Sequence, residues 1–292
     1  MFDVPDVRKV HKTPTPRLGG LAFVPVIMIS VCIITGIRYY MNNPVDSLWS
    51  SSLFIQYLFL VAGMTLLYLI GVADDLVGVG YRYKFIVQIL SASFLPLSGL
   101  WINDLGGLLG FHAIPAFIGM PLTVFLVVYI TNAINLIDGI DGLASGLTCI
   151  ALVLLIIVCA LTGQWTHALL ASATLGVVST FYYYNVFSAS DRKLFMGDAG
   201  SLTLGYILSF LVLHFWMQES YWDPFELNLN MVTISALLIP LLDVIRVFVS
   251  RVRDGRNPFL PDKNHIHHKL LRTGMRAVSY THLRAHETEA DL

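Results

Sequence analysis

The sequence predicts an all-α protein, a bundle of transmembrane helices that crosses the membrane about eight times. Composition indicates this fold class. Of the 292 residues, 56% are hydrophobic and only 13% are charged, whereas an average soluble domain carries about 25% charged residues. The mean hydropathy is +0.70. These values exclude a typical soluble enzyme, a disordered chain and a nucleic-acid binder with a broad basic face.

Eight apolar runs of roughly 17–22 residues are the predicted spans. As helices that rise about 1.5 Å per residue, they are long enough to cross a hydrocarbon core about 30 Å thick. They are too long and too uniformly apolar to be strands of a β-barrel. In chain order, the predicted spans cover residues 19–40, 53–72, 84–101, 119–137, 143–162, 167–187, 201–217 and 229–250.

Local signals justify the ends of these spans. Two glycines open the first span, an acidic pair closes the second, and a basic loop precedes the third. The stretch 101–118 before the fourth span is rich in glycine and is expected to be a loop or a short interfacial hairpin. Glycines separate the fourth span from the fifth, and a Gly-Asp-Ala-Gly turn precedes the seventh. Trp165 marks the outer edge before the sixth span, and basic residues close the eighth.

The distribution of lysine and arginine predicts the orientation. Loops on the opposite side carry only Arg38. Because cytoplasmic loops are enriched in basic residues, the other side is predicted to be cytoplasmic, and eight spans place both ends of the chain there. The basic residues assigned to that side are Arg8, Lys9, Lys12, Arg17, Arg82, Lys84, Arg192, Lys193, Arg251, Arg253, Arg256 and Lys263.

One membrane-embedded domain is expected over residues 1–276. Residues 277–292 are polar and aperiodic, and we interpret them as a non-native tail. The domain itself is expected to be truncated at both ends.

An acidic pair, Asp74 and Asp75, closes the second predicted span. Adjacent carboxylates repel each other, so a pair at membrane depth indicates a cation or a proton-transfer task. The alternative is a solvated span end whose carboxylates pair with Arg82 and Lys84.

Two amides and two acids follow at the end of the fourth span: Asn132, Asn135, Asp138 and Asp141. Steps of three residues place successive side chains on adjoining parts of one helix face. The set suits a hard cation such as Mg²⁺, or a sugar nucleotide. A polar helix cap would need fewer such groups.

A third motif, Phe-Met-Gly-Asp-Ala-Gly-Ser at residues 195–201, precedes the seventh span. Free N–H groups at a helix N-terminus form a ready anion site, so these groups are expected to receive a phosphate. Asp198 in the same place suits a metal that bridges to that phosphate. The alternative interpretation is an N-cap with turn glycines.

Cationic segments lie near both ends of the chain. Arg256 and the cluster His265, His267 and His268 favour a pyrophosphate clamp over a zinc site, because no cysteine or second histidine cluster accompanies them. Contact of this segment with anionic lipid is the alternative. Near the N-terminus, Lys12 lies in a basic, proline-containing loop and is expected to screen phosphate charge. The alternative is an ordinary cytoplasmic loop, since such loops are basic in any case.

Five segments in this order resemble the polyprenyl-phosphate N-acetylhexosamine-1-phosphate transferases (glycosyltransferase family 4), most closely their WecA/TagO branch. The resemblance covers about residues 3–275. It rests on DVPDVRKVHKTPTPRLGG, GVADD, NAINLIDGIDGLASG, FMGDAGS and GRNPFLPDKNHIHHKLL. The resemblance implies a bundle of about ten or eleven helices in the bacterial cytoplasmic membrane, with its active site on the cytoplasmic face.

The family's activity is then expected here. It transfers an N-acetylhexosamine 1-phosphate, with GlcNAc favoured, from a UDP-sugar to a polyprenyl phosphate such as undecaprenyl phosphate. The products are UMP and a polyprenyl diphosphate sugar, the first lipid-linked intermediate of a cell-envelope glycan. The resemblance implies Mg²⁺, with Mn²⁺ as an alternative, no nucleic-acid partner, and leaves a homodimer open. The alternative function is a transporter or proton relay that uses the membrane carboxylates.

The resemblance also assigns roles to residues. Asp74 is expected to accept a proton from the lipid phosphate, with support from Asp75. Asp198 and Asn135 are expected to bind the metal, and Lys84 and Lys12 to bind phosphate. The residues expected to hold the nucleotide and sugar are Asn132, Asp138, Asp141, Arg256, His265, His267 and His268. Direct attack by the lipid phosphate is the preferred mechanism, and a route through an aspartyl intermediate is the rival.

Overall fold

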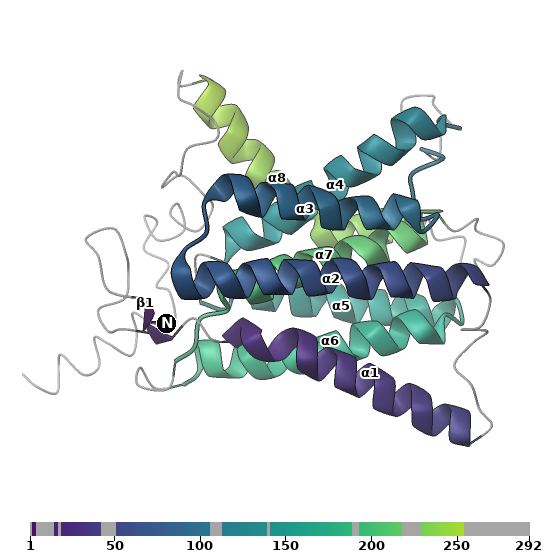
Figure 1. The fold of residues 1–292 in the computed structure, drawn as a ribbon, viewed down its shortest axis with the longest axis horizontal. Coiled ribbons are helices and arrows are strands. Elements are labelled where there is room, and N and C mark those ends of the chain that lie inside the picture. Colours follow the sequence, from purple (N-terminus) through teal and green to yellow (C-terminus); the bar gives the residue numbers. More distant parts are fainter. Residues whose placement is uncertain are drawn as a thin grey trace, which may run out of the picture.

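A computed structural model of the chain describes residues 2–3, 15–16, 19–41, 51–105, 113–138, 141–188, 193–217 and 229–253. This part is a helix bundle whose members run back and forth along its long axis (Figure 1). The eight α-helices of the described residues are α1 (Phe23–Tyr40), α2 (Ser51–Val77), α3 (Tyr81–Leu97), α4 (Ala116–Ile137), α5 (Leu143–Leu161), α6 (Trp165–Val186), α7 (Gly197–Met217) and α8 (Leu229–Arg253).

Each predicted span falls on one of these helices, so the predicted all-α bundle is confirmed. Five helical segments among the described residues have the length and apolar composition to cross a membrane. They are Gly19–Tyr40, Ser52–Val77, Ala116–Ile137, Leu143–Leu161 and Gly197–Met217. The chain is therefore a multi-pass membrane protein.

Short elements join or precede the helices. A short 3-10 helix, η1 (Gly19–Ala22), leads into α1, and the two-residue strands β1 (Phe2–Asp3) and β2 (Thr15–Pro16) pair antiparallel. Between α3 and α4 the chain folds back on itself, with an antiparallel bridge between Asp104 and Ala113. This bridge agrees with the hairpin expected within 101–118.

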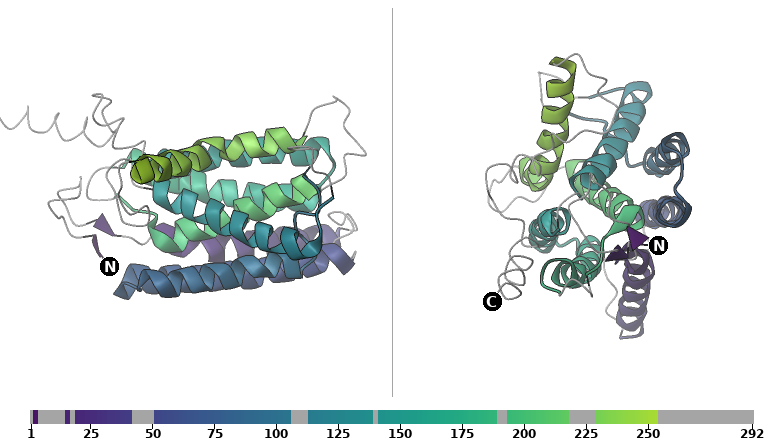
Figure 2. Two further views of the ribbon diagram at one scale, coloured as in Figure 1. Left: turned by 90° about the horizontal axis from the view of Figure 1, so that it is seen from above. Right: turned by 90° about the vertical axis from the view of Figure 1, so that its left-hand side faces the viewer.

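Helix α7 is the centre of the bundle, and in the end-on view of Figure 2 the other helices surround it. Every residue from Ala199 to Leu213 is buried. Small residues let its neighbours approach closely: a Cβ at Gly63 of α2 would lie 2.2 Å from the Tyr206 hydroxyl, and one at Gly205 would lie 2.6 Å from the Thr131 Cα. A helix that is apolar on all sides suits such a central position, because it has no polar face that needs water.

Successive helices are antiparallel, which sorts their ends into two groups. One end of the bundle, the carboxylate end, gathers the C-termini of α2, α4 and α6 and the N-termini of α3, α5 and α7. It holds Asp74, Asp75 and Asp198. We call the other end, which holds residues 98–105, 113–115 and 162–164, the opposite end.

Several predicted boundaries differ from the structure. At the opposite end, α3 ends at Leu97 rather than at residue 101. The other two clear differences are at the carboxylate end. Helix α2 continues through the acidic pair to Val77 rather than ending near residue 72, and α7 begins at Gly197 rather than at residue 201. Both helices extend through charged residues because those side chains find partners in neighbouring helices.

Candidate active site

Lys84 links two carboxylates that lie far apart in the sequence. Its Nζ lies 3.2 Å from Asp74 Oδ2 and also donates to Asp198 Oδ2. Asp74 is in the last turn of α2, Lys84 in the first turn of α3 and Asp198 in the first turn of α7. The three side chains are partly buried, with 15–23% of each exposed, so their attraction is screened less than at a free surface.

Asp75 holds the start of α7. Its carboxylate accepts hydrogen bonds from the backbone N–H groups of Asp198 and Ala199, at 2.9 and 3.0 Å. The sequence predicted that these N–H groups receive a phosphate, but the structure gives them to Asp75. Gly197 permits the contact, because its φ is +71° and a Cβ there would lie 2.6 Å from Asp75 Oδ2. Asp75 therefore fixes the position of the Asp198 backbone.

Asp74 also orders the turn that follows α2. Its Oδ1 accepts a hydrogen bond from the Val79 N–H at 2.7 Å, and its backbone carbonyl accepts one from the Gly78 N–H at 2.9 Å. One carboxylate oxygen thus faces the turn and the other faces Lys84. This connection fixes where α3 begins and therefore where Lys84 lies.

Asn135 completes this cluster from α4. Its Nδ2 donates to Asp198 Oδ1 at 3.1 Å and to Ser201 Oγ at 2.8 Å. The structure thus brings together five of the predicted residues, which we call the carboxylate cluster: Asp74, Asp75, Lys84, Asn135 and Asp198. Ser201, which the sequence analysis did not single out as a ligand, borders it one turn into α7.

Asn132 lies one turn deeper in the bundle and faces α3. It forms a reciprocal amide pair with buried Gln88, at 2.8 and 3.3 Å. Sequence reasoning missed Gln88, although its spacing of four residues from Lys84 places both on one face of α3. The pair fixes the relative position of α3 and α4 beneath the cluster.

Asp141 belongs to a second polar cluster at the same end. Lys193 Nζ donates to Asp141 Oδ2 at 2.5 Å, and Asn185 Nδ2 lies 3.5 Å from Asp141 Oδ1. Asn185, which is 4% exposed, also bonds the Gly142 N–H and the Leu194 carbonyl. It therefore ties the α4–α5 connection to the segment before α7. Asn185 was missed because a single amide near the end of an apolar span forms no motif with its neighbours.

Asp138 caps the C-terminus of α4, between these two clusters in the sequence. Its N–H donates to the Asn135 carbonyl at 3.3 Å. Five predicted site residues lie outside the described residues: Lys12, Arg256, His265, His267 and His268.

The donor set of the carboxylate cluster fits a hard divalent cation. Within the described residues, no three His, Cys, Asp or Glu side chains converge as a complete metal centre. Mg²⁺, however, is usually held by one or two carboxylates, with water and substrate phosphates completing its shell. Asp74 and Asp198 already share one cation, the Lys84 ammonium group, and all nearby ligands are oxygens or amides.

Comparison with known proteins agrees with the predicted family. The model of the family described as Glycosyl transferase family 4 matches residues 57–215. A Bacillus subtilis protein named "Probable undecaprenyl-phosphate N-acetylglucosaminyl 1-phosphate transferase" is 33% identical over 94% of this chain and 70% of its own length. With the same coverage, the undecaprenyl-phosphate alpha-N-acetylglucosaminyl 1-phosphate transferase of Yersinia pestis is 30% identical.

The decaprenyl-phosphate N-acetylglucosaminephosphotransferase of Mycobacterium leprae is 34% identical over 92% of this chain and 70% of its own length. All three relatives are named as transferases of N-acetylglucosamine phosphate to undecaprenyl or decaprenyl phosphate. The chain belongs to glycosyl transferase family 4, the family of polyprenyl-phosphate sugar-1-phosphate transferases that its motifs resemble.

Proposed function

We propose that this chain transfers N-acetylglucosamine 1-phosphate from UDP-N-acetylglucosamine to a polyprenyl phosphate. The observation that carries the proposal is the carboxylate cluster, which gathers three carboxylates, an ammonium group and an amide at one end of a membrane bundle. An acceptor with its tail in lipid and a water-soluble donor can meet only at such an end. The names of the relatives support the same reaction.

The proposed reaction is a direct displacement. An oxygen of the lipid phosphate attacks the phosphorus that carries the sugar, the bond from that phosphorus to the oxygen bridging the two phosphates breaks, and UMP leaves with the bonding electrons. Two anions must approach each other, so cationic groups aimed at the phosphates lower the barrier. Lys84 is the described residue placed to do so.

We propose Mg²⁺ as the metal, with Mn²⁺ as an alternative, held by Asp198 and Asn135. When bound, the metal would neutralise phosphate charge and orient the diphosphate. Lys84 now lies between Asp74 and Asp198. If a metal takes over the Asp198 carboxylate, the Lys84 ammonium group is free to contact a phosphate.

We propose the remaining roles from the resemblance to the family. Asp74 would accept a proton from the lipid phosphate, and Asp75 would support it by holding α7. Asp138, Asp141 and Asn132 would contact the nucleotide and the sugar. Lys12, Arg256, His265, His267 and His268 are proposed to bind the phosphates and the sugar nucleotide. The excess of lysine and arginine supports a cytoplasmic location for this end.

The test is release of UMP from UDP-N-acetylglucosamine by membranes that contain the protein. Release is expected to need both a divalent cation and a polyprenyl phosphate, and Asp198→Asn is expected to abolish it while the protein still inserts. Release that is independent of lipid would contradict the proposal. Substrate flux across proteoliposomes without UMP would instead support the transporter alternative.

A further inference from the structure

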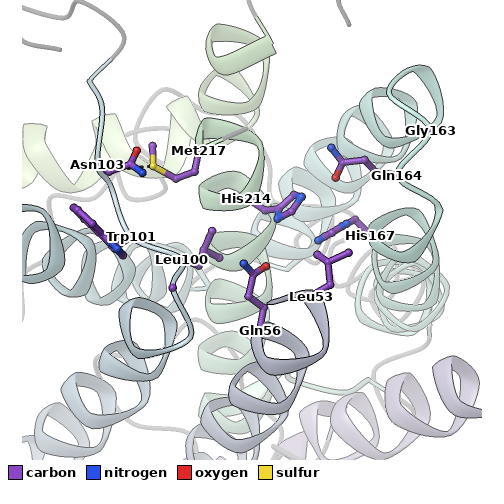
Figure 3. A pocket seen from close by; sticks show the side chains of 11 residues that line it. Leu53, Gln56, Leu100, Trp101, Asn103, Gly163, Gln164, His167, His214 and Met217 are labelled. Carbon is purple, nitrogen blue, oxygen red and sulfur yellow. Dashed lines mark hydrogen bonds between the residues drawn. The ribbon is translucent and has the colours of Figure 1, made fainter. Parts of the chain in front are cut away.

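A second polar site lies at the opposite end of the bundle. A cavity of about 400 Å³ is lined there by residues of α2, the α3–α4 connection, the α5–α6 turn, α6 and α7 (Figure 3). His214 on its wall and Asp198 lie at opposite ends of α7, about 24 Å apart at about 1.5 Å per residue. The cavity is therefore separate from the carboxylate cluster, and the proposed reaction makes no use of it.

Polar atoms in the wall of this cavity lack partners. Within the described part of the chain, no hydrogen bond reaches Gln56 Oε1, Gln164 Oε1, Gln164 Nε2 or His167 Nε2, and all four atoms are buried. His167 is only 2% exposed. Figure 3 shows Gln56, His167 and His214 converging on one region. A buried polar atom without a partner costs about 1–3 kcal/mol, so this wall favours an occupant that both donates and accepts hydrogen bonds.

The geometry of the two histidines argues against a metal ion. The rings of His167 and His214 are stacked, with centroids 3.7 Å apart and planes 23° from parallel. A metal must lie in the plane of each ligating imidazole, about 2.0–2.1 Å from its nitrogen. In stacked rings, the lone pairs of the imidazole nitrogens lie in two nearly parallel planes. The nitrogens of His167 and His214 therefore cannot both point at one ion. No Cys, Asp or Glu is among the described residues that line the cavity.

The lining also argues against a charged ligand. Its described residues include two Gln, one Asn, two His and one Trp, and no Lys, Arg, Asp or Glu. Moving an ion into such a site without an opposite charge is costly. The amide and imidazole groups of this lining instead suit a neutral molecule with several hydroxyl or amide groups. The cavity volume lies within the range of small-molecule sites, about 300–1,000 Å³.

We propose that this cavity binds a neutral saccharide at the membrane face opposite the carboxylate cluster. Gln56 and Gln164 supply the hydrogen bonds that select hydroxyl and amide groups, and His167 supplies a third. On this proposal, each glutamine amide contacts the ligand and does not stabilise the fold. Replacing the amide with an apolar side chain should therefore raise the stability of the unliganded protein and lower its affinity for the ligand.

The experiment measures thermal unfolding of the purified protein with unphosphorylated N-acetylglucosamine as the probe. N-acetylglucosamine is expected to raise the Tm. Glucosamine, which has the same ring but carries an ammonium group, is not. In Gln56→Leu/Gln164→Leu, the Tm without sugar is expected to rise, and the apparent affinity for N-acetylglucosamine is expected to fall by about tenfold or more.

Two control variants distinguish sugar binding in this cavity from binding elsewhere on the protein. Thr65→Val removes an exposed hydroxyl of α2 that bonds only its own helix, at the Val61 carbonyl, and should leave the sugar response unchanged. Asp198→Asn should also keep the response, because it alters the other end of α7. Retention of the response in both variants, with its loss in the double glutamine variant, supports the proposal.

Three outcomes would overturn it. The first is a lower Tm of the double glutamine variant together with a wild-type Tm that N-acetylglucosamine does not change. This result would show that the amides stabilise the fold and do not bind a sugar. The second is a sugar response lost in Asp198→Asn but kept in the double glutamine variant, which would place the sugar at the carboxylate cluster. The third is stabilisation by ZnCl₂ that His167→Phe abolishes, which would identify a metal site.

Discussion

At the scale of single residues, the ammonium group of Lys84 stabilises the carboxylate cluster when no metal is bound. Asp74 and Asp198 approach the same point from α2 and α7. Two like charges in a partly buried site repel each other strongly. Lys84 offsets that repulsion and competes with any other cation for the same oxygens.

Lys84→Met should therefore change turnover and the apparent affinity for Mg²⁺ in opposite directions. Turnover is expected to fall by about 10²–10³-fold, the usual cost of losing one donor to a developing anion. The apparent affinity for Mg²⁺ is expected to rise, because the competing cation is gone. UMP release measured over a Mg²⁺ titration gives both values. Arg82→Met is the matched control, since Arg82 is exposed and its Nε bonds Tyr81; turnover should then stay near the wild-type value.

Asp75 offers a second prediction, because its carboxylate caps α7. Asp75→Ala removes the acceptor of two N–H groups and should lower stability by about 0.5–2 kcal/mol, together with turnover. Asp75→Asn keeps one acceptor oxygen and should retain a measurable part of both. Urea unfolding and UMP release are compared for the two variants. Equal loss of activity with unchanged stability would show that Asp75 takes part in proton transfer instead.

The sequence named the members of the carboxylate cluster but not their partners. Asp74, Asp75, Lys84, Asn135 and Asp198 stand out because charged and amide groups are rare beside apolar spans. That Asp75 bonds the backbone of α7 could not be predicted, because the two segments are more than 120 residues apart. For the same reason, the sequence did not show that Gln88 pairs with Asn132 or that Asn185 bonds Asp141, because each pair is 44 residues apart.

At the scale of elements, the contact between η1 and α7 holds the glycine-rich segments together. The Gly19 and Gly20 N–H groups donate to the carbonyls of Phe195 and Met196, at 3.0 and 2.8 Å. A Cβ on Gly20 would lie 2.2 Å from the Gly200 backbone nitrogen. The start of the first span therefore supports the loop that leads into α7, whose first turn carries Asp198.

Gly20→Ala should force η1 away from α7, since backbone atoms cannot yield as a flexible side chain can. We expect a loss of stability of about 1–3 kcal/mol, as for an overpacked core, and reduced turnover. Gly36→Ala is the control within α1, because its Cβ would meet nothing within 4 Å; it should raise stability by about 0.5–1 kcal/mol. Unfolding midpoints of the two variants test this, and equal midpoints would contradict the close contact.

Hydropathy located the helices better than it located their ends. Long apolar runs have few alternatives to a helix in lipid, so all eight runs were assigned to the correct element type. The pattern stops where charge begins, however, and α2 and α7 do not. Their extra residues are stabilised by contacts between helices, which composition does not record.

At the scale of the whole molecule, the two ends of the bundle differ in chemistry. Among the described residues, the carboxylate end holds the ion pairs of Lys84 and Lys193, whereas the cavity at the opposite end is lined by uncharged side chains. This asymmetry is what the distribution of lysine and arginine predicted, and it supports a fixed orientation in the membrane.

Thiol labelling tests that orientation. In a background without Cys32, Cys149 and Cys159, a cysteine at Val79 should react with a membrane-impermeant reagent only after the cells are opened. A cysteine at Trp165, which is exposed at the opposite end, should react in intact cells. The reverse pattern would place the carboxylate cluster outside the cytoplasm and contradict the proposed access of a nucleotide sugar.

The enclosure of α7 also bears on how the protein responds to its bilayer. Changes in lipid thickness act on helices that touch lipid, which tilt or bend to match it. From Ala199 to Leu213, α7 presents no exposed side chain, so such forces reach it only through its neighbours. The helix that carries Asp198 is thus mechanically insulated, and the outer helices can adjust to different membranes while the spacing within the carboxylate cluster is preserved.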